Sequence, residues 1–139
     1  MSANTAKLEG LHHIAMRAND YDASFKFYTE GLGMKRAYGW GEGDNRACML
    51  DLGDGNYLEL FSGGKGVPGE DVPDGSFLHL ALRTHDVDGM FARALAAGAV
   101  PTTEPKDVPI EGDKPLVFRI AFCKGLNGEI LEFFYNDVL

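Results

Sequence analysis

The sequence lacks the features of a secreted, membrane or disulfide-rich protein. Only two cysteines, Cys48 and Cys123, occur in 139 residues, too few for a disulfide framework or a thiolate metal site. No apolar run approaches the roughly 20 residues that span a bilayer, and the N-terminal "MSANTAKLEG" lacks the apolar core of a secretory signal. We therefore expect a cytoplasmic protein with no membrane partner, whose two thiols are reduced and buried on strands.

Basic side chains are also scarce. The chain has 13 Lys and Arg against 21 Asp and Glu, a formal charge of −8, and no basic cluster that could follow a phosphate backbone. We therefore expect no nucleic-acid partner. The chain is instead rich in apolar residues: 45% are hydrophobic, enough to build the core of one globular domain of this length.

The chain contains an internal repeat. "HIAMRANDYDASF", from His13, aligns with "HLALRTHDVDGMF", from His79, at a shift of 66 positions. "DGNYLELF", from Asp54, aligns with "NGEILEFF", from Asn127, at a shift of 73. The second copy is therefore longer between its matched ends, and the extra residues fall in the Pro-rich stretch 101–115. We predict a single domain, 1–139, made of two repeats (about 8–62 and 77–136) joined by a Gly/Pro-rich linker, 62–76.

Each repeat predicts the same order of elements. Residues 11–17 alternate as in a strand, and an amphipathic helical stripe follows at 21–32, with Asp20 as the candidate N-cap. The second copy repeats this stripe at 87–95 and closes at Gly98. Three strand-like runs then follow each helix: near 35–40, 46–52 and 56–61, and near 99–103, 116–123 and 129–135. The predicted fold class is α+β, with two tandem β-α-β-β-β modules, and the insertion 101–115 is expected to be a surface loop or a lid.

Alternation along the strands separates a core face from a polar face, because alternate side chains of a strand share a face. In the second copy, Leu78, Leu80 and Leu82 form a plain core face and leave His79 and Arg83 on the other. Each repeat supplies to its polar face one His and one Arg from the first strand and one Glu from the last: His13, Arg17 and Glu59, then His79, Arg83 and Glu132.

Two imidazoles and two carboxylates suit one divalent ion per site, which could be nickel, zinc, cobalt, manganese or iron. The two carboxylates would offset the charge of the ion. A lone His on a strand is more often structural, and a lone Glu could pair with an Arg. Four such residues at equivalent repeat positions favour a metal site, provided that the first and last strands of each repeat are neighbours.

The other residues of the polar faces have two interpretations each. Arg17 and Arg83 either anchor a substrate carboxylate or pair with acidic side chains at the rim of the site. Four further side chains either wall a substrate pocket or pack between the sheets: Tyr57, Phe61, Ile130 and Phe134. Three titratable residues lie off these faces: His12 and His85 are expected to be structural or solvated, and Glu129 is expected to be exposed.

The segments that carry these residues resemble the vicinal oxygen chelate superfamily, also called the glyoxalase, bleomycin-resistance and dioxygenase superfamily. The resemblance extends from about Leu8 to Tyr135 and rests on "LHHIAMRANDYDASFKFYTEGLGM", "YLELF", "FLHLALRTHDVD" and "NGEILEFF". It implies paired β-α-β-β-β modules whose curved mixed sheets form a cup around a metal, with the two His and two Glu as ligands. In several branches it also implies a homodimer, and the cup then either closes within one chain or draws its ligands from two.

Within the superfamily the chain is similar to small bacterial glyoxalase I enzymes, which share its length and its His, Glu, His, Glu order. These enzymes carry an Arg that helps to hold the carboxylate of glutathione, and Arg17 stands at its position. The chain departs from their pattern at Gly63, where they usually have Asn, and at Gly75, where Arg is often present. The implied partner is a small-molecule substrate, and a glutathione adduct is one candidate.

The resemblance implies a metal-dependent isomerase or lyase. Such an enzyme would transfer a proton next to a carbonyl through a metal-bound enediolate, on an α-hydroxycarbonyl or α-ketoaldehyde adduct. Glu132 and Glu59 are the candidate catalytic residues, because one of them would carry the proton. The alternatives are a small-molecule binding protein of the antibiotic-resistance type, a ring-cleaving dioxygenase, which a fourth ligand at Glu59 disfavours, and a structural module without metal.

Overall fold

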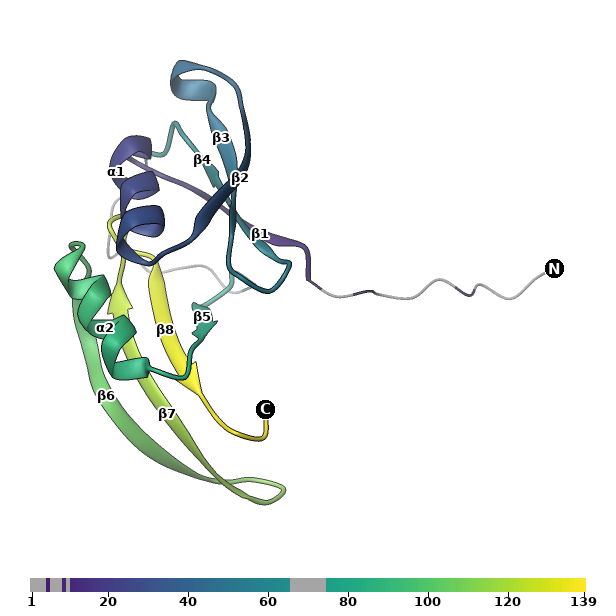
Figure 1. The fold of residues 1–139 in the computed structure, drawn as a ribbon, viewed down its shortest axis with the longest axis vertical. Helices are drawn as coiled ribbons and strands as arrows, with labels where there is room; N and C mark the ends of the chain where they lie inside the picture. The colour runs from purple at the N-terminus through teal and green to yellow at the C-terminus, as the bar shows by residue number, and fades with distance from the viewer. Residues whose placement is uncertain (1–4, 6–8, 10, 66–74) are drawn as a thin grey trace.

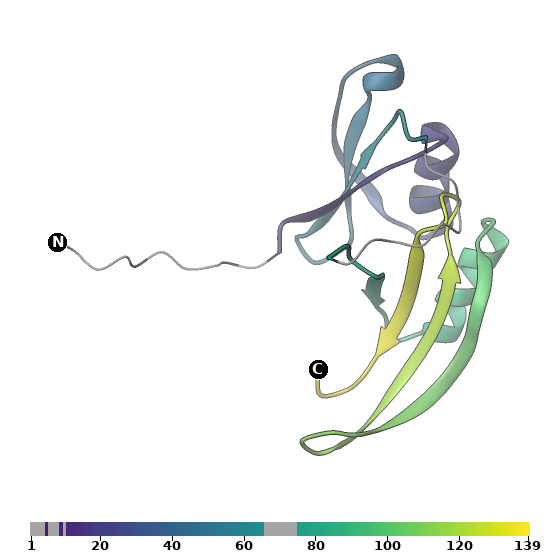
Figure 2. The same ribbon diagram turned by 180° about the vertical axis from the view of Figure 1, so that it is seen from behind.

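The structure is a computed structural model that describes residues 5, 9, 11–65 and 75–139. It has two modules, each a four-stranded mixed sheet with a helix against one face, and they lie one above the other in Figures 1 and 2. The predicted α+β class with two β-α-β-β-β modules is confirmed. Most of the predicted linker, 66–74, lies outside the described residues.

The first module follows the predicted order closely. Its sheet has the strand order β1-β4-β3-β2, in which β1 runs parallel to β4 and the other pairs are antiparallel. The elements are β1 (His13–Arg17), α1 (Tyr21–Lys26), the π-helical turn η1 (Phe27–Gly31), β2 (Lys35–Trp40), the short 3-10 turn η2 (Gly43–Asn45), β3 (Ala47–Asp51) and β4 (Tyr57–Phe61).

The second module repeats this topology with the order β5-β8-β7-β6, and β5 runs parallel to β8. Its elements are β5 (Leu80–Arg83), α2 (Val87–Ala96), β6 (Val100–Glu111), β7 (Pro115–Lys124) and β8 (Ile130–Tyr135). The first and last strands of each module are therefore neighbours, as the metal-site hypothesis requires.

Two expectations for this module are wrong. The insertion 101–115 is neither a loop nor a lid, because it forms most of β6 and the turn into β7, which together make a long hairpin. Leu78 does not belong to the core face: it precedes β5 and is 70% exposed, whereas Leu80 and Leu82 pack against the core.

Both helices begin at a capping aspartate. The Asp20 Oδ1 accepts a hydrogen bond from the Ala23 amide, and Asp86 Oδ1 accepts one from the Gly89 amide, so each cap satisfies an amide of the first turn. The helices lie on the same side of the molecule (Figure 1). Their apolar stripes and the inner faces of both sheets form one core, which includes the free thiols of Cys48 and Cys123.

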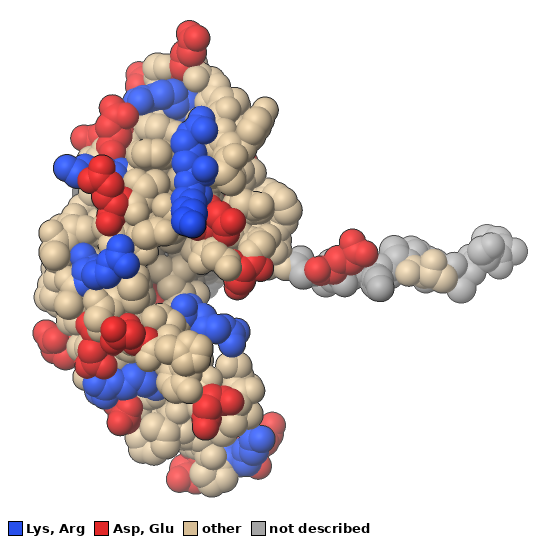
Figure 3. Space-filling view, in the orientation of Figure 1, with Lys and Arg blue, Asp and Glu red and all other residues tan. Residues whose placement is uncertain are grey.

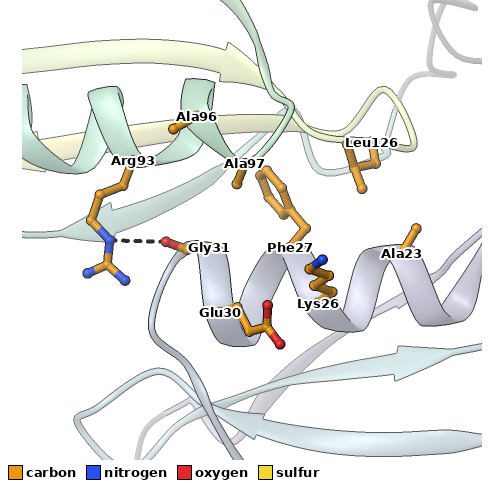
Figure 4. Close-up of a pocket in the computed structure, with 9 residues that line it drawn as sticks. All are labelled: Ala23, Lys26, Phe27, Glu30, Gly31, Arg93, Ala96, Ala97 and Leu126. Carbon is orange, nitrogen blue, oxygen red and sulfur yellow. Dashed lines mark hydrogen bonds between the residues drawn. The ribbon is translucent and has the colours of Figure 1, made fainter.

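The modules approach each other where the end of η1 meets the end of α2. A Cβ built at Gly31 would lie only 2.7 Å from the Ala97 Cβ, so the backbones can approach this closely only with glycine there. A groove of about 560 Å³ runs beside this contact, with Arg93 Nε donating to the Gly31 carbonyl at 3.1 Å (Figure 4). This groove lies on the helical side of the molecule and contains none of the predicted site residues.

A partly buried polar network also joins the modules. The Tyr28 hydroxyl donates to Glu129 Oε2 at 2.6 Å, and the Asn127 side chain donates to Ser24 Oγ at 2.9 Å. The expectation that Glu129 is exposed is wrong, because the turn between β7 and β8 inserts against α1 of the other module. Burial, and next the Glu129 carboxylate, raise the pKa of Tyr28 well above its usual value, so its hydroxyl remains a donor.

The surface carries charges of both signs. Basic and acidic side chains are interspersed over both modules on the face shown in Figure 3. Among the described residues, no helix is long and apolar enough to cross a membrane.

Candidate metal and substrate site

The parallel pairing of first and last strands brings each His to the Glu of its own repeat. In the first module Ala15 is the partner of Glu59, and His13 Nε2 lies 3.6 Å from Glu59 Oε1. In the second, Ala81 is the partner of Glu132, and His79 Nε2 lies 3.1 Å from Glu132 Oε2. The sequence alternation thus identified two equivalent His–Glu pairs.

The spacing of each pair fits two ligands of one ion. Two donors bound at about 2.1 Å, at angles between a right angle and the tetrahedral angle, lie about 3.0–3.4 Å apart. The observed distances of 3.6 and 3.1 Å are close to this range. A neutral imidazole with a carboxylate is also a donor set that divalent first-row metals accept, so the residues fit the implied metal.

The two pairs do not meet within one chain. Over residues 11–65 and 75–139, no three of the His, Cys, Asp and Glu side chains form a group that could hold a metal ion. Each module instead presents its pair on the open face of its own sheet, on the side away from the helices. One chain therefore carries two half-sites, which we name the His13–Glu59 half-site and the His79–Glu132 half-site.

The carboxylates are better shielded from water than the imidazoles. Side-chain exposure is 14% for Glu59 and 10% for Glu132, against 37% for His13 and 39% for His79. Burial raises the pKa of Glu132 above its usual value, and the nearby His79 opposes this effect only in part. A cation beside Glu132 would offset the cost of burying its charge.

His12 belongs to the first half-site, although strand alternation places it on the other face. It precedes β1, and its Nδ1 lies 2.8 Å from the Nδ1 of His13, while its ring packs against Tyr57. A hydrogen bond at one ring nitrogen fixes the tautomer and orients the other nitrogen toward a metal. Here that other nitrogen is the Nε2 that faces Glu59. The sequence signal that could have revealed this contact is the adjacent pair His12 and His13.

Both arginines donate to main-chain oxygens. Arg17 Nη1 donates to the Ser62 carbonyl at 3.0 Å, and Arg83 Nη1 donates to the main-chain oxygen of Leu139 at 3.1 Å. In the part of the chain that the structure describes, neither guanidinium forms an ion pair with an Asp or Glu side chain. The rim ion pairs are therefore not found there, and the role of the two arginines as substrate anchors stays a prediction.

Aromatic side chains lie on the sheet faces that carry both half-sites. Phe61 lies under the Arg17 guanidinium, and Phe134 makes an edge contact with Phe118 at 5.0 Å. The sequence interpretation missed Tyr38 and Trp40, which also lie on the face of Glu59. The pairing of β2 with β3 shifts between Arg36 and Tyr38, and such a bulge changes which residues of a strand share a face.

The chain matches the family model described as "Glyoxalase/Bleomycin resistance protein/Dioxygenase superfamily" over residues 10–117. It is 31% identical over 124 residues to the lactoylglutathione lyase GLX1 of Arabidopsis thaliana, and this alignment covers 86% of the chain and 42% of the relative. The chain thus spans less than half of the length of this curated relative.

Solved structures share the fold at lower identity. A glyoxylase/bleomycin resistance protein/dioxygenase domain from Frankia sp. EAN1pec aligns with a TM-score of 0.74 and 24% identity, covering 94% of the chain and 99% of the domain. TnmS3, an antibiotic binding protein from Streptomyces sp. CB03234, aligns with a TM-score of 0.67 and 22% identity, covering 92% and 96%. These similarities establish the fold that the strands and helices already indicate.

Proposed function

The chain belongs to the glyoxalase/bleomycin resistance protein/dioxygenase superfamily, and from this premise we propose that it is a metal-dependent isomerase or lyase of the glyoxalase I type. One observation carries the proposal: two His–Glu pairs stand at equivalent positions of two repeats, each with a donor spacing suited to one ion. The proposed substrate is an α-hydroxycarbonyl or α-ketoaldehyde adduct, and the lactoylglutathione lyase relative makes a glutathione adduct the first one to test.

Glu132 is the proposed proton carrier. Its carboxylate accepts a proton from the carbon next to the substrate carbonyl, and the electron pair of that C–H bond moves toward the carbonyl oxygen. The proton then returns to the neighbouring carbon, so no oxidant or reductant is consumed. The raised pKa of Glu132 favours retention of the proton between the two steps, and Glu59 is the second candidate for this role.

A divalent ion held by the two half-sites would supply positive charge that stabilises the developing negative charge on the substrate oxygens. His13 and His79 would bind it through Nε2, and the His12 contact would keep the His13 ring in the required orientation. Arg17, on the same face as His13, is the proposed anchor for a substrate carboxylate.

A second chain would complete the proposed site. One chain holds two half-sites, and its described residues contain no larger group of metal ligands. A two-fold dimer in which module 1 of each chain faces module 2 of its partner would join unlike half-sites into two full sites. A homodimer is therefore part of the proposal.

Metal analysis and turnover test the proposal together. We expect the purified protein to hold about one ion per chain, because a two-fold dimer of this kind has two sites. We expect it to consume the hemithioacetal of methylglyoxal and glutathione, to lose that activity with a chelator and to regain it with added metal. Glu132→Gln should abolish turnover, whereas Glu104→Gln, at an exposed position of β6, should retain it. A metal-loaded protein that leaves the hemithioacetal untouched would exclude the glyoxalase I reaction.

A small-molecule binding protein of the same superfamily is the second candidate. Its support is the pair of glycines that stand where small bacterial glyoxalase I enzymes usually or often have Asn and Arg. Gly63 and Gly75 have φ angles of +80° and +88°, in the region that favours glycine. The backbone therefore disfavours an Arg at Gly75, whereas it tolerates an Asn at Gly63 better. This candidate predicts tight binding of a ligand without its conversion.

A further inference from the structure

Three aromatic residues of the first module form a strip beside the His13–Glu59 half-site, on the same open face. Across the sheet, Phe61 pairs with Ala47, which pairs with Trp40, and Glu59 pairs with Met49, which pairs with Tyr38. Paired residues of neighbouring strands share a face. Trp40 and Tyr38 therefore stand across the sheet from Phe61 and Glu59, and we name Tyr38, Trp40 and Phe61 the aromatic strip.

The rings of the strip touch one another but leave large surfaces uncovered. Tyr38 and Trp40 are tilted at 34° with centroids 5.8 Å apart, and Trp40 meets Phe61 nearly edge-on, at 85° and 6.3 Å. Tyr38 is nonetheless 65% exposed and Trp40 41% exposed. Ala47, between Trp40 and Phe61, is buried, so the surface that a flat group can lie against is that of the exposed rings.

A cation lies at one end of the strip. The Arg17 guanidinium sits over the Phe61 ring with its carbon 5.4 Å from the centroid, and one of its nitrogens is fixed by the Ser62 carbonyl. The corresponding face of the second module carries two lysines beside Glu132: Lys124 pairs with Ile130, and Lys106 pairs with Ile120. If a partner's second module closes over the strip, positive groups approach from both sides, and an acidic ligand would balance them.

We infer that the aromatic strip is the specificity subsite of this protein and that it binds a planar aromatic ring whose acid group reaches Arg17. The inference rests on the proposed function in one respect, because it places the reacting atoms of the same ligand at the neighbouring His13–Glu59 half-site. Uncovered ring faces favour stacking with another π system over contact with a flexible chain. The substrate class is thus an aromatic acid that bears an α-hydroxycarbonyl or α-ketoaldehyde group.

Trp40 is the single tryptophan of the chain, so its indole N–H signal in an NMR spectrum reports on the strip alone. The probes are 2-naphthoate, its fully saturated decalin analogue of similar shape and charge, and the neutral 2-naphthalenemethanol. We expect saturable binding of 2-naphthoate by calorimetry with a shift of the Trp40 signal. We expect the decalin acid to bind about 3- to 10-fold more weakly, as the loss of ring stacking predicts.

Two variants separate the contribution of ring stacking to binding from the contribution of charge. Phe61→Leu should reduce the preference for the naphthyl over the decalin acid, whereas Phe77→Leu, an exposed phenylalanine outside the strip, should leave it unchanged. Arg17→Met should weaken 2-naphthoate about tenfold, as expected for a lost charge-assisted hydrogen bond, and leave the neutral alcohol unaffected.

The inference is overturned if both acids bind equally, if the Trp40 signal does not move, or if Tyr38→Ala disrupts the dimer while binding persists, since the strip would then be a contact between chains. These measurements require no turnover. Naphthoate binding without hemithioacetal turnover would keep the subsite and remove the glyoxalase I proposal. Hemithioacetal turnover without naphthoate binding would keep the glyoxalase I proposal and remove the aromatic subsite.

Discussion

Glu132 is a carboxylate in an unusual position for a charged side chain. It occupies the middle of an apolar strand, and the repeat supplies its equivalent at Glu59. Each carboxylate lies beside the histidine of its own module, as the proposed metal ligation requires. The pairing was predictable from the sequence because strand alternation and the repeat together fix which residues share a face.

The buried charge of Glu132 predicts a pH-dependent stability. Its pKa is raised in the folded state, so as pH rises through the window between the usual and the raised value, the unfolded chain loses the proton first. The folded state then binds more protons, stability falls across that window, and the full loss persists above it. Without metal, Glu132→Gln should melt at a higher temperature than the parent at neutral pH, and the difference should shrink below the usual pKa of glutamate.

Thermal melts in the presence of a chelator, over a range of pH, measure this effect, with Glu104→Gln as the exposed control. Addition of a divalent metal should stabilise the parent protein and not the Glu132→Gln variant. A metal-free variant that is less stable than the parent at neutral pH would contradict the desolvation argument.

At the scale of elements, the helices were predictable and the longest strand was not. The apolar stripes located α1 and α2, and Asp20 marked the start of α1, because these signals lie in neighbouring residues. In β6, however, Pro101, Pro105 and Pro109 suggested a loop. The strand lies at the edge of its sheet, where the missing N–H of proline need not face a neighbour, and this position depends on a topology that local sequence does not encode.

The contact between α1 and the turn before β8 gives a second prediction. Tyr28 is fully buried, and its hydroxyl donates to Glu129 at 2.6 Å. Because the acceptor is a carboxylate, Tyr28→Phe should lower the free energy of unfolding by about 1.5–3 kcal/mol. Urea denaturation measures the loss, and Tyr38→Phe, which removes an exposed hydroxyl, should change stability by less than about 0.5 kcal/mol. Equal stability of the Tyr28→Phe variant and the parent would show that the network contributes little.

At the scale of the molecule, the separation of the half-sites could not be predicted from strand alternation. It depends on how the modules pack, and that packing is set by the Gly31–Ala97 contact and the Tyr28 network between helix and turn. Neither contact has a periodic signature in the sequence. Alternation gave the four residues and their pairing, whereas it left open whether one chain or two would join the pairs.

The two-chain site predicts complementation between inactive variants. His13→Ala and His79→Ala should each abolish metal-dependent turnover as pure proteins. In a mixed dimer, one site loses both histidines, while the other combines His13 of one chain with His79 of its partner and is intact. Random mixing after co-refolding should therefore restore about a quarter of the parent activity. Mixing that restores none would place each complete site within a single chain.

The parallel pairing of first with last strands also has a consequence for folding. β1 and β4 are the two ends of module 1, and β5 and β8 are the two ends of module 2, so neither His meets its Glu until the whole module has closed. Contacts that join distant parts of a chain form at a higher entropic cost than the local hairpins. Each half-site thus forms only where the first and last strands of its module pair. A chain interrupted before β8 would contain His79 but could not form the His79–Glu132 pair.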